Sequence, residues 1–232
     1  MQMLGHNESD YAPPPRSETA FGIRRAVRAD IAAIVKLHAV SLPQFDLADP
    51  GPAFLRRFYS FVLRDPEGFL FVSEQSHAVA GFVAGLAHPV QLYQRVASGR
   101  FHIFACASAC LISHPVQLPK FLADLRRARG FKGQSSDGCE TACELITVAV
   151  QPRMRMQGHG KALVLALAEA AKCHKMAQVC VHVGSDDGGM AMFYRSLGFK
   201  PLRTFKTFDA RWLDEYVLTF EDNGMAGRSS RP

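Results

Sequence analysis

The feature that most constrains this chain is an apolar strand followed by a proline, a basic loop and a helix. Residues 140–150 are the strand candidate, Pro152 follows it, and an Ala- and Leu-rich helix is predicted over 158–176. Gly158 and Gly160 stand at the start of this helix, where glycine lets the backbone pass close to a ligand. Because the first amide groups of a helix favour an anion, this order of elements predicts a phosphate-binding site.

Basic side chains support the same interpretation. Arg153, Arg155 and Lys161 add positive charge around the start of the helix. The whole chain has a formal net charge of +6 and a pI near 9.1. A basic surface favours anionic ligands of many kinds and does not single out nucleic acid, so no nucleic-acid partner is expected.

Two common phosphate-binding loops do not fit these residues. A Walker loop needs glycine where Arg155 stands, and serine or threonine where Ala162 stands. A dinucleotide fingerprint needs a third glycine where Leu163 stands. It also needs an acidic residue after the next strand, and Asp186 lies close to that position without matching it cleanly. The phosphate therefore belongs to another class of ligand.

The other predicted elements form a mixed α/β sheet with a strand–helix–strand unit at its centre. Helix candidates are a segment capped by Asp30 and running from Ile31 to His38, and residues 52–64 and 189–197. Strand candidates are residues 21–25, 68–74, 78–86, 178–184, 200–208 and 212–220. We expect residues 1–20 and 223–232 to be disordered tails, 21–222 to be a single domain, and about 88–138 to be a helical insertion.

Composition narrows the possible roles. No metal site is expected, because the cysteines lack the tight spacing and convergent histidines of zinc sites; they are Cys106, Cys110, Cys139, Cys143, Cys173 and Cys180. No signal peptide and no run of ~20 apolar residues is present, so we expect a cytoplasmic protein with reduced thiols. The basic end of residues 88–138 could contact anionic lipid or an acidic partner. We favour a helix that packs on the core and exposes a solvated basic face.

Three segments resemble the GNAT family of N-acetyltransferases. Residues 155–160, RMQGHG, resemble the family's R/Q-x-x-G-x-G/A loop, and Val150-Gln151-Pro152 resembles the Val-x-Pro before it. Residues 192–199, MFYRSLGF, resemble the apolar-Tyr-x-x-x-Gly-Phe signature, and residues 23–38, IRRAVRADIAAIVKLH, resemble a GNAT start. The resemblance covers 21 to about 220 apart from 88–138. It implies the GNAT acyl-CoA transferase fold, a mixed central sheet with splayed strands.

The resemblance also implies roles for single residues. Backbone groups of Val148 and Val150 would bind the pantetheine arm of acetyl-CoA. Asp187 stands where many members carry an asparagine that helps to bind this arm. Tyr194 matches the general acid that protonates the leaving CoA thiolate, and Glu144 matches a catalytic carboxylate of histone-type members. Loop amides would hold the pyrophosphate; they belong to Arg155, Met156, Gln157, Gly158, His159, Gly160 and Lys161.

Several of these residues have a simpler interpretation. Tyr194 could be an amphipathic core residue, although the motif favours catalysis. Glu144 could be a strand-end charge, and Glu140 competes with it as the base. His159 is expected to be a solvated loop residue. His182, on a valine-rich strand, is expected to be a satisfied buried histidine rather than a base.

The activity implied by the resemblance is transfer of an acetyl group from acetyl-CoA to a primary amine by direct attack. We favour a small amine or an amino sugar as the acceptor over a protein or peptide amine. A non-catalytic acyl-CoA-binding module is the alternative. Residues 42–66 and 88–138 are expected to line the acceptor side. Many family members dimerise, but no interface signal is visible, so a homodimer stays open.

Overall fold

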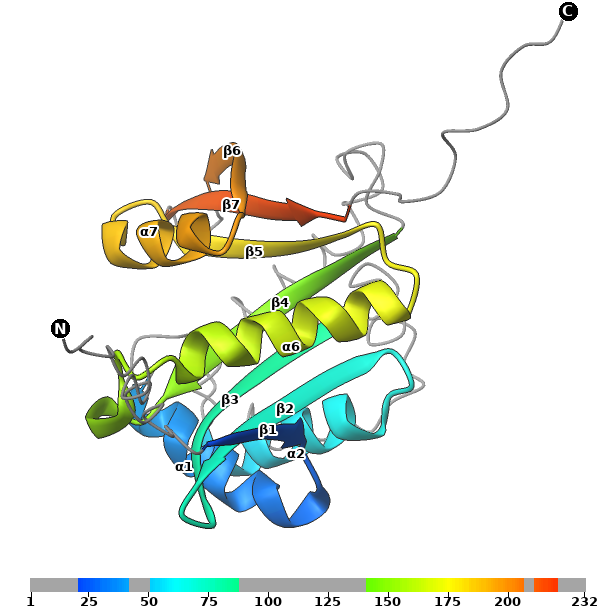
Figure 1. Ribbon diagram of the computed structural model, residues 1–232, viewed down its shortest axis with the longest axis vertical. Coiled ribbons are helices and arrows are strands. Elements are labelled where there is room, and N and C mark those ends of the chain that lie inside the picture. The colour runs from blue at the N-terminus through cyan, green and yellow to red at the C-terminus, as the bar shows by residue number, and fades with distance from the viewer. Residues whose placement is uncertain (1–20, 42–50, 88–140, 207–210, 221–232) are drawn as a thin grey trace, which may run out of the picture.

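In the computed structural model, which describes residues 21–41, 51–87, 141–206 and 211–220, seven strands form one sheet (Figure 1). The strand order is β1–β2–β3–β4–β5–β7–β6; β4 and β5 are parallel, and the other neighbouring pairs are antiparallel. The strands are β1 (Gly22–Arg25), β2 (Gly68–Gln75), β3 (Ala78–Ala87), β4 (Ala142–Val150), β5 (Gln178–Gly184), β6 (Lys200–Lys206) and β7 (Trp212–Thr219). The predicted mixed α/β class is confirmed.

The predicted tails and the predicted insertion at 88–138 lie outside the described residues, as do Glu140 and residues 42–50 of the segment expected to line the acceptor side.

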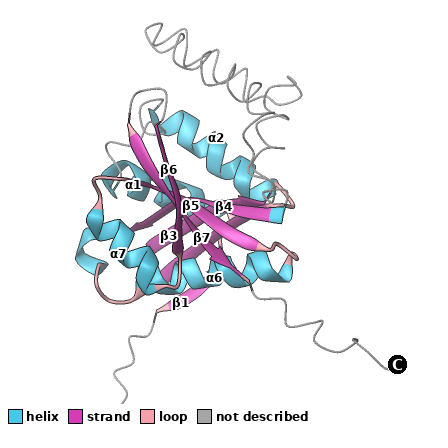
Figure 2. Cartoon of the chain, turned by 90° about the horizontal axis from the view of Figure 1, so that it is seen from above, coloured by secondary structure: helices cyan, strands magenta, loops and turns pink. Residues whose placement is uncertain are grey.

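Helices cover both faces of the sheet, as Figure 2 shows from above. On one face α1 (Ile31–Ser41) packs beside α2 (Gly51–Arg64). On the opposite face lie α6 (His159–Cys173) and α7 (Gly188–Ser196). Two short 3₁₀ turns, η1 (Arg28–Asp30) and η5 (Pro152–Met154), precede α1 and α6. Within the described ranges, no helix is long and apolar enough to cross a membrane.

The β2–β3 hairpin closes through a turn centred on two residues, Ser76 and His77. Ser76 and His77 have φ of 50° and 60°, so both central residues adopt the positive φ that a type I′ turn requires. Gln75 and Ala78 close the ladder on either side. The two predicted strands are confirmed, and this turn joins them.

The start of α1 differs from the prediction. Asp30 was expected to cap the helix, but it is the last residue of η1 and its Oδ2 accepts a hydrogen bond from the Val27 amide at 2.8 Å. The same carboxylate binds the Arg24 guanidinium at 2.7 and 2.9 Å. The Arg24 hydrogen bond lowers the pKa of Asp30 against the opposing effect of burial. Asp30 therefore fastens α1 to β1 rather than capping its first turn.

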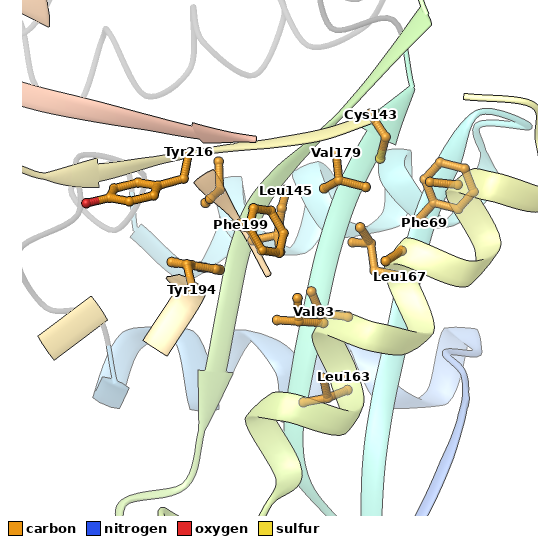
Figure 3. Packing of buried hydrophobic residues seen from close by; sticks show 14 of the residues in the cluster. Phe69, Val83, Cys143, Leu145, Leu163, Leu167, Val179, Tyr194, Phe199 and Tyr216 are labelled. Atoms are coloured by element: carbon orange, nitrogen blue, oxygen red, sulfur yellow. The ribbon is translucent and has the colours of Figure 1, made fainter. Parts of the chain in front are cut away.

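Two apolar cores lie on opposite faces of the sheet. The core beneath α1 and α2 includes Tyr59, Val62 and Phe82, none of which is exposed. The core beneath α6 is shown in Figure 3, where Leu163 and Leu167 of the helix lie against Val83 of β3. Leu163 and Leu167 are one helical turn apart, which is why a single face of α6 covers the sheet.

Candidate active site

A gap opens in the sheet where β4 and β5 stop pairing. Their register runs from Ala142 opposite Gln178 to Leu145 opposite Val181. Beyond that point β4 continues beside β3, and β5 continues beside β7. Figure 1 shows the two parallel strands diverging. The result is the splayed pair of strands that the sequence resemblance implied.

A β-bulge lies at the same point. The β3–β4 register passes from Ala84 opposite Thr147 to Gly85 opposite Leu145, so Ile146 is the extra residue on β4. Before the bulge Leu145 packs in the core beneath α6, and after it Val148 packs there too. A bulge that adds one residue reverses which residues face which side. The bulge therefore changes the direction of β4 where the gap begins.

The gap is lined by backbone groups of β4. The Gln151 amide donates to the Ala80 carbonyl at 2.8 Å, which fixes which residues of β4 bond to β3. In an antiparallel ladder alternate residues turn their N–H and C=O groups away from the partner. By that alternation Val148 and Val150 direct their N–H and C=O groups away from β3 and toward the gap. The Val150 carbonyl accepts a 3.4 Å bond from Nε of Arg155.

The N-terminus of α6 is open to an anion. Gly158 has φ +90° and ψ −10°, and the first helical bond runs from the Ala162 amide to the Gly158 carbonyl at 3.0 Å. The amides of His159, Gly160 and Lys161 therefore precede the helical hydrogen-bond ladder. In the part of the chain that is described, no side chain caps this end, and no acidic residue lies in its first turn.

The loop itself is exposed and basic. The side chains of Arg155, Gln157 and Lys161 face solvent, and Met156 is fully exposed with φ 62°. Gln157 Nε2 donates to the Arg153 carbonyl at 3.1 Å and tightens the turn. Exposed positive charge beside free helix amides attracts a phosphate group.

The exposure of His159 differs from the prediction. His159 is 1% exposed rather than a solvated loop residue, and its Nδ1 lies 2.5 Å from the Ser73 hydroxyl on β2. Its ring packs on Phe21 with centroids 4.0 Å apart. Burial lowers the pKa of His159, so the ring stays neutral. The side chain anchors the first turn of α6 to the sheet, while its backbone amide stays at the open helix end.

Helix α7 contacts the same helix end. A β-carbon on Gly160 would lie 3.5 Å from Phe193 Cζ and 3.8 Å from Val150 Cγ2. Because Gly160 has no side chain, α6, α7 and the end of β4 approach one another closely. The phosphate loop, the gap and α7 are therefore neighbours.

Tyr194 on α7 is a core residue in this structure. It is 2% exposed and makes edge contacts with Phe193 and Phe199 at 5.2 and 5.3 Å between centroids. Figure 3 shows it near Phe199 in the core beneath α6. Burial, with a smaller effect from the negative charge of Asp187, raises the pKa of Tyr194 well above its usual value. The phenol therefore keeps its proton at neutral pH.

Asp187 uses its carboxylate to start α7. It is the N-cap residue, and its Oδ1 accepts a hydrogen bond from the Met190 amide at 3.0 Å. This is the ordinary role of aspartate at a helix N-terminus. Asp187 is exposed, so the predicted contact with pantetheine would have to be made by a side chain that already serves as a cap.

Glu144 belongs to a row of charged side chains on the face of the sheet opposite α6. Its Oε1 lies 3.3 Å from Nδ1 of His182 on β5. Nε2 of His182 lies 3.8 Å from Glu215 on β7, and Glu215 accepts a 2.5 Å bond from Arg203 on β6. Burial acts to lower the pKa of His182, but the two carboxylates outweigh it and raise that pKa to about 9. His182 is therefore a cation between two carboxylates at neutral pH.

Comparison with known proteins fits this geometry. A protein-family model described as an acetyltransferase (GNAT) domain matches residues 122–201. Over these residues the chain is similar to the GNAT acetyltransferase domain. The matched residues include β4, the phosphate loop, α6, β5 and α7, which are the elements that build the gap and the open helix end. GNAT acetyltransferases form a class of acyltransferase enzymes.

Solved structures of GNAT proteins share the fold. The ribosomal-protein-S18-alanine N-acetyltransferase from Escherichia coli is 14% identical with a TM-score of 0.55, over 90% of this chain and 99% of that chain. Ard1 from Thermoplasma volcanium is 15% identical with a TM-score of 0.56, over 88% and 99%. The ribosomal-protein-alanine N-acetyltransferase from Brucella melitensis is 16% identical with a TM-score of 0.55, over 85% and 99%. No curated protein matches the chain in sequence.

Two residues beside the candidate site were not predicted from the sequence. Glu215 and Arg203 complete the row that holds His182, and neither was singled out. Period-two alternation in residues 212–219 does put Glu215 on the face opposite the buried Tyr216. Its pairing with His182 requires β7 to lie between β5 and β6, and local residue patterns do not specify that order. Among the described residues no cluster of three or more metal-ligating side chains occurs.

Proposed function

We propose that this chain transfers an acetyl group from acetyl-CoA to a primary amine. The observation that carries the proposal is the uncapped N-terminus of α6, which faces the end of β4 across Gly160. A helix end of this kind binds phosphate groups, and the gap beside it offers backbone groups to an extended ligand arm. Acetyl-CoA combines a pyrophosphate with such an arm.

Each predicted cofactor residue has a part in this proposal, including Asp187, which would contact the pantetheine arm from the N-cap of α7. The pyrophosphate would lie on the amides from Arg155 to Lys161, with the exposed side chains of those two residues nearby. The pantetheine arm would take the place of the missing strand neighbour along Val148 and Val150. The thioester would then lie near Leu145, where the gap closes.

The reaction needs a base and an acid at that point. Glu144, or a water molecule that it holds, would accept the proton of the acceptor ammonium. The free amine would attack the thioester carbonyl, forming the C–N bond and breaking the C–S bond. Tyr194 would donate its proton to the leaving thiolate and would then be reprotonated by the surplus proton that the attacking nitrogen carries after the C–N bond forms. Because Tyr194 is 2% exposed, the cofactor sulfur must enter the gap to reach it.

For the acceptor we propose a small amine or an amino sugar first and a peptide amine second. Two of the similar structures are alanine N-acetyltransferases of ribosomal proteins, so a peptide that begins with alanine belongs in the same test. Identities of 14% and 16% support the fold and leave the acceptor to experiment. The cytoplasmic location predicted from the sequence is part of this proposal.

The first test is isothermal titration of acetyl-CoA into the purified protein, with CoA and NAD as comparisons. We expect micromolar binding of acetyl-CoA and none of NAD. Lys161→Glu, at the N-terminus of α6, should weaken binding about tenfold or more by placing a carboxylate beside the open amides. Lys172→Glu makes the same change in the last turn of the same helix and should leave affinity unchanged.

The second test separates an enzyme from a binding module. Release of CoA thiol would be followed with glucosamine, simple alkylamines and an alanine-initiated peptide as acceptors. Turnover that depends on Tyr194 supports the transferase. Tight binding of acetyl-CoA without turnover of any amine would favour the non-catalytic acyl-CoA-binding module. Failure to bind acetyl-CoA would contradict both the transferase and the acyl-CoA-binding module.

A further inference from the structure

We propose that His182 is a positioning residue: its positive charge holds the Glu144 carboxylate where the gap between β4 and β5 closes. The inference rests on the proposed function, which makes Glu144 the base. It assigns a role to a side chain that the sequence indicated only as a satisfied buried histidine.

Strand register is the first support. Glu144 lies opposite Cys180, and Leu145 opposite Val181 is the last pair of the β4–β5 ladder. His182 is therefore the first residue of β5 beyond the ladder. Its 3.3 Å ion pair with Glu144 joins the two strands where the backbone hydrogen bonds end.

Burial and charge are the second support. The side chain of Glu215 is 6% exposed, and a buried carboxylate needs a compensating cation. It has two, Arg203 at 2.5 Å and His182 at 3.8 Å. The order Glu144, His182, Glu215, Arg203 alternates in sign across four strands, so a neutral His182 would leave Glu144 without its cation.

The ring of His182 is also fixed in orientation. Phe205 of β6 packs edge-on against it, with centroids 5.3 Å apart and planes at 85°. Nδ1 points to Glu144 and Nε2 to Glu215, so both nitrogens have a carboxylate partner. With Oε1 of Glu144 held by the imidazolium, we assign Oε2 to the acceptor amine.

The test compares His182→Gln, His182→Lys and the control His174→Gln, which makes the same change at an exposed position following α6. Glucosamine and an alanine-initiated peptide serve as acceptor probes. His182→Gln should lower kcat about tenfold or more with little change in KM for acetyl-CoA, because the base loses its orientation. His182→Lys should restore much of the rate, since it returns a cation. His174→Gln should match the native rate.

A second readout needs no turnover. In ¹⁵N-histidine NMR at pH 7.5, His182 should give the signal of an imidazolium in the native protein. Glu144→Gln combined with Glu215→Gln should convert it to the neutral ring.

The outcomes distinguish the two proposals. If Glu144→Gln reacts at the native rate, Glu144 is not the base, and the inference about His182 is wrong as well. A large loss in Glu144→Gln beside a native rate in His182→Gln leaves the base in place and overturns the inference alone. A neutral His182 ring at pH 7.5 overturns the inference whatever the acceptor, and a charged ring with the predicted loss and rescue supports it.

Discussion

The Ser73 hydroxyl lies 2.5 Å from Nδ1 of His159, and this buried hydrogen bond joins β2 to the first turn of α6. Ser73 is fully buried and His159 is 1% exposed, so water does not replace a lost partner. The contact therefore fixes the open helix end to the sheet before any ligand arrives.

Ser73→Ala should lower the free energy of unfolding by about 1–3 kcal/mol, because it leaves a buried imidazole nitrogen unpaired. Urea denaturation measures this change. Ser185→Ala removes an exposed serine hydroxyl that bonds Asp214 at 2.9 Å, and should cost less than about 0.5 kcal/mol. Equal stability of the two variants would show that the Ser73–His159 bond contributes little.

Gly158→Ala should destabilise the protein. At φ +90° an alanine is strained, which costs about 1–2 kcal/mol, whereas the nearest side-chain atom, Phe21 Cζ, is 3.8 Å from the new methyl and causes no clash. Acetyl-CoA affinity should fall as the loop relaxes. Thermal unfolding and titration calorimetry measure the two effects. A variant with native melting temperature would mean that the loop adopts another conformation in solution.

Gly160→Ala should separate binding from folding. Its β-carbon would make ordinary contacts with Phe193 and Val150 at 3.5 and 3.8 Å, and alanine in a helix is favoured over glycine by up to about 1 kcal/mol. Stability should therefore be unchanged or slightly higher. The methyl group would occupy the helix end where we propose that the pyrophosphate binds, so acetyl-CoA affinity should fall at least about tenfold. Native affinity would place the pyrophosphate elsewhere.

Sequence periodicity predicted most of the elements because each depends on local residues. The buried positions Leu55, Tyr59 and Val62 recur at helical spacing in α2. The splayed strands were implied by family resemblance. Nothing in the residues around Ile146 indicates the bulge, because it depends on the register with β3.

The errors at the candidate site have the same origin. His159 lies between two glycines in a basic loop, a context typical of a solvated residue. Its partners come from far along the chain: Ser73 is 86 positions away, and Phe21 belongs to the start of the described chain. His182 was recognised as a satisfied histidine, but its charge depends on carboxylates that β4 and β7 bring to it.

Tyr194→Phe should abolish most turnover with little effect on folding. The phenyl ring keeps the contacts with Phe193 and Phe199, so the free energy of unfolding should change by less than about 1 kcal/mol. Loss of the proton donor should lower kcat by about 100-fold or more at unchanged acetyl-CoA affinity. Tyr216→Phe is the matched control in the same core and should retain activity. A fully active Tyr194→Phe would leave Tyr194 as a packing residue alone.

Stability should depend on pH through His182. Its pKa is about 9 in the folded protein and ordinarily 6.5, so its stabilising effect is complete below about pH 6.5 and is lost as pH rises through 9. The groups that face its ring are Glu144, Glu215 and Phe205, with Arg203 acting through Glu215. On the acid side, His182 and Arg203 lower the pKa of Glu215 against the effect of burial, so its contribution is lost as pH falls below the usual carboxylate range.

The measurement is the free energy of unfolding by urea from pH 7 to pH 10, in the native protein and in His182→Gln. The native protein should lose on the order of 2 kcal/mol more than the variant, once the partial exposure of the ring is allowed for. Lysines and tyrosines titrate in both proteins, so the difference between the two curves reports His182. Parallel curves would mean that His182 is already neutral at pH 7, and the ion pair with Glu144 would then be a hydrogen bond without charge.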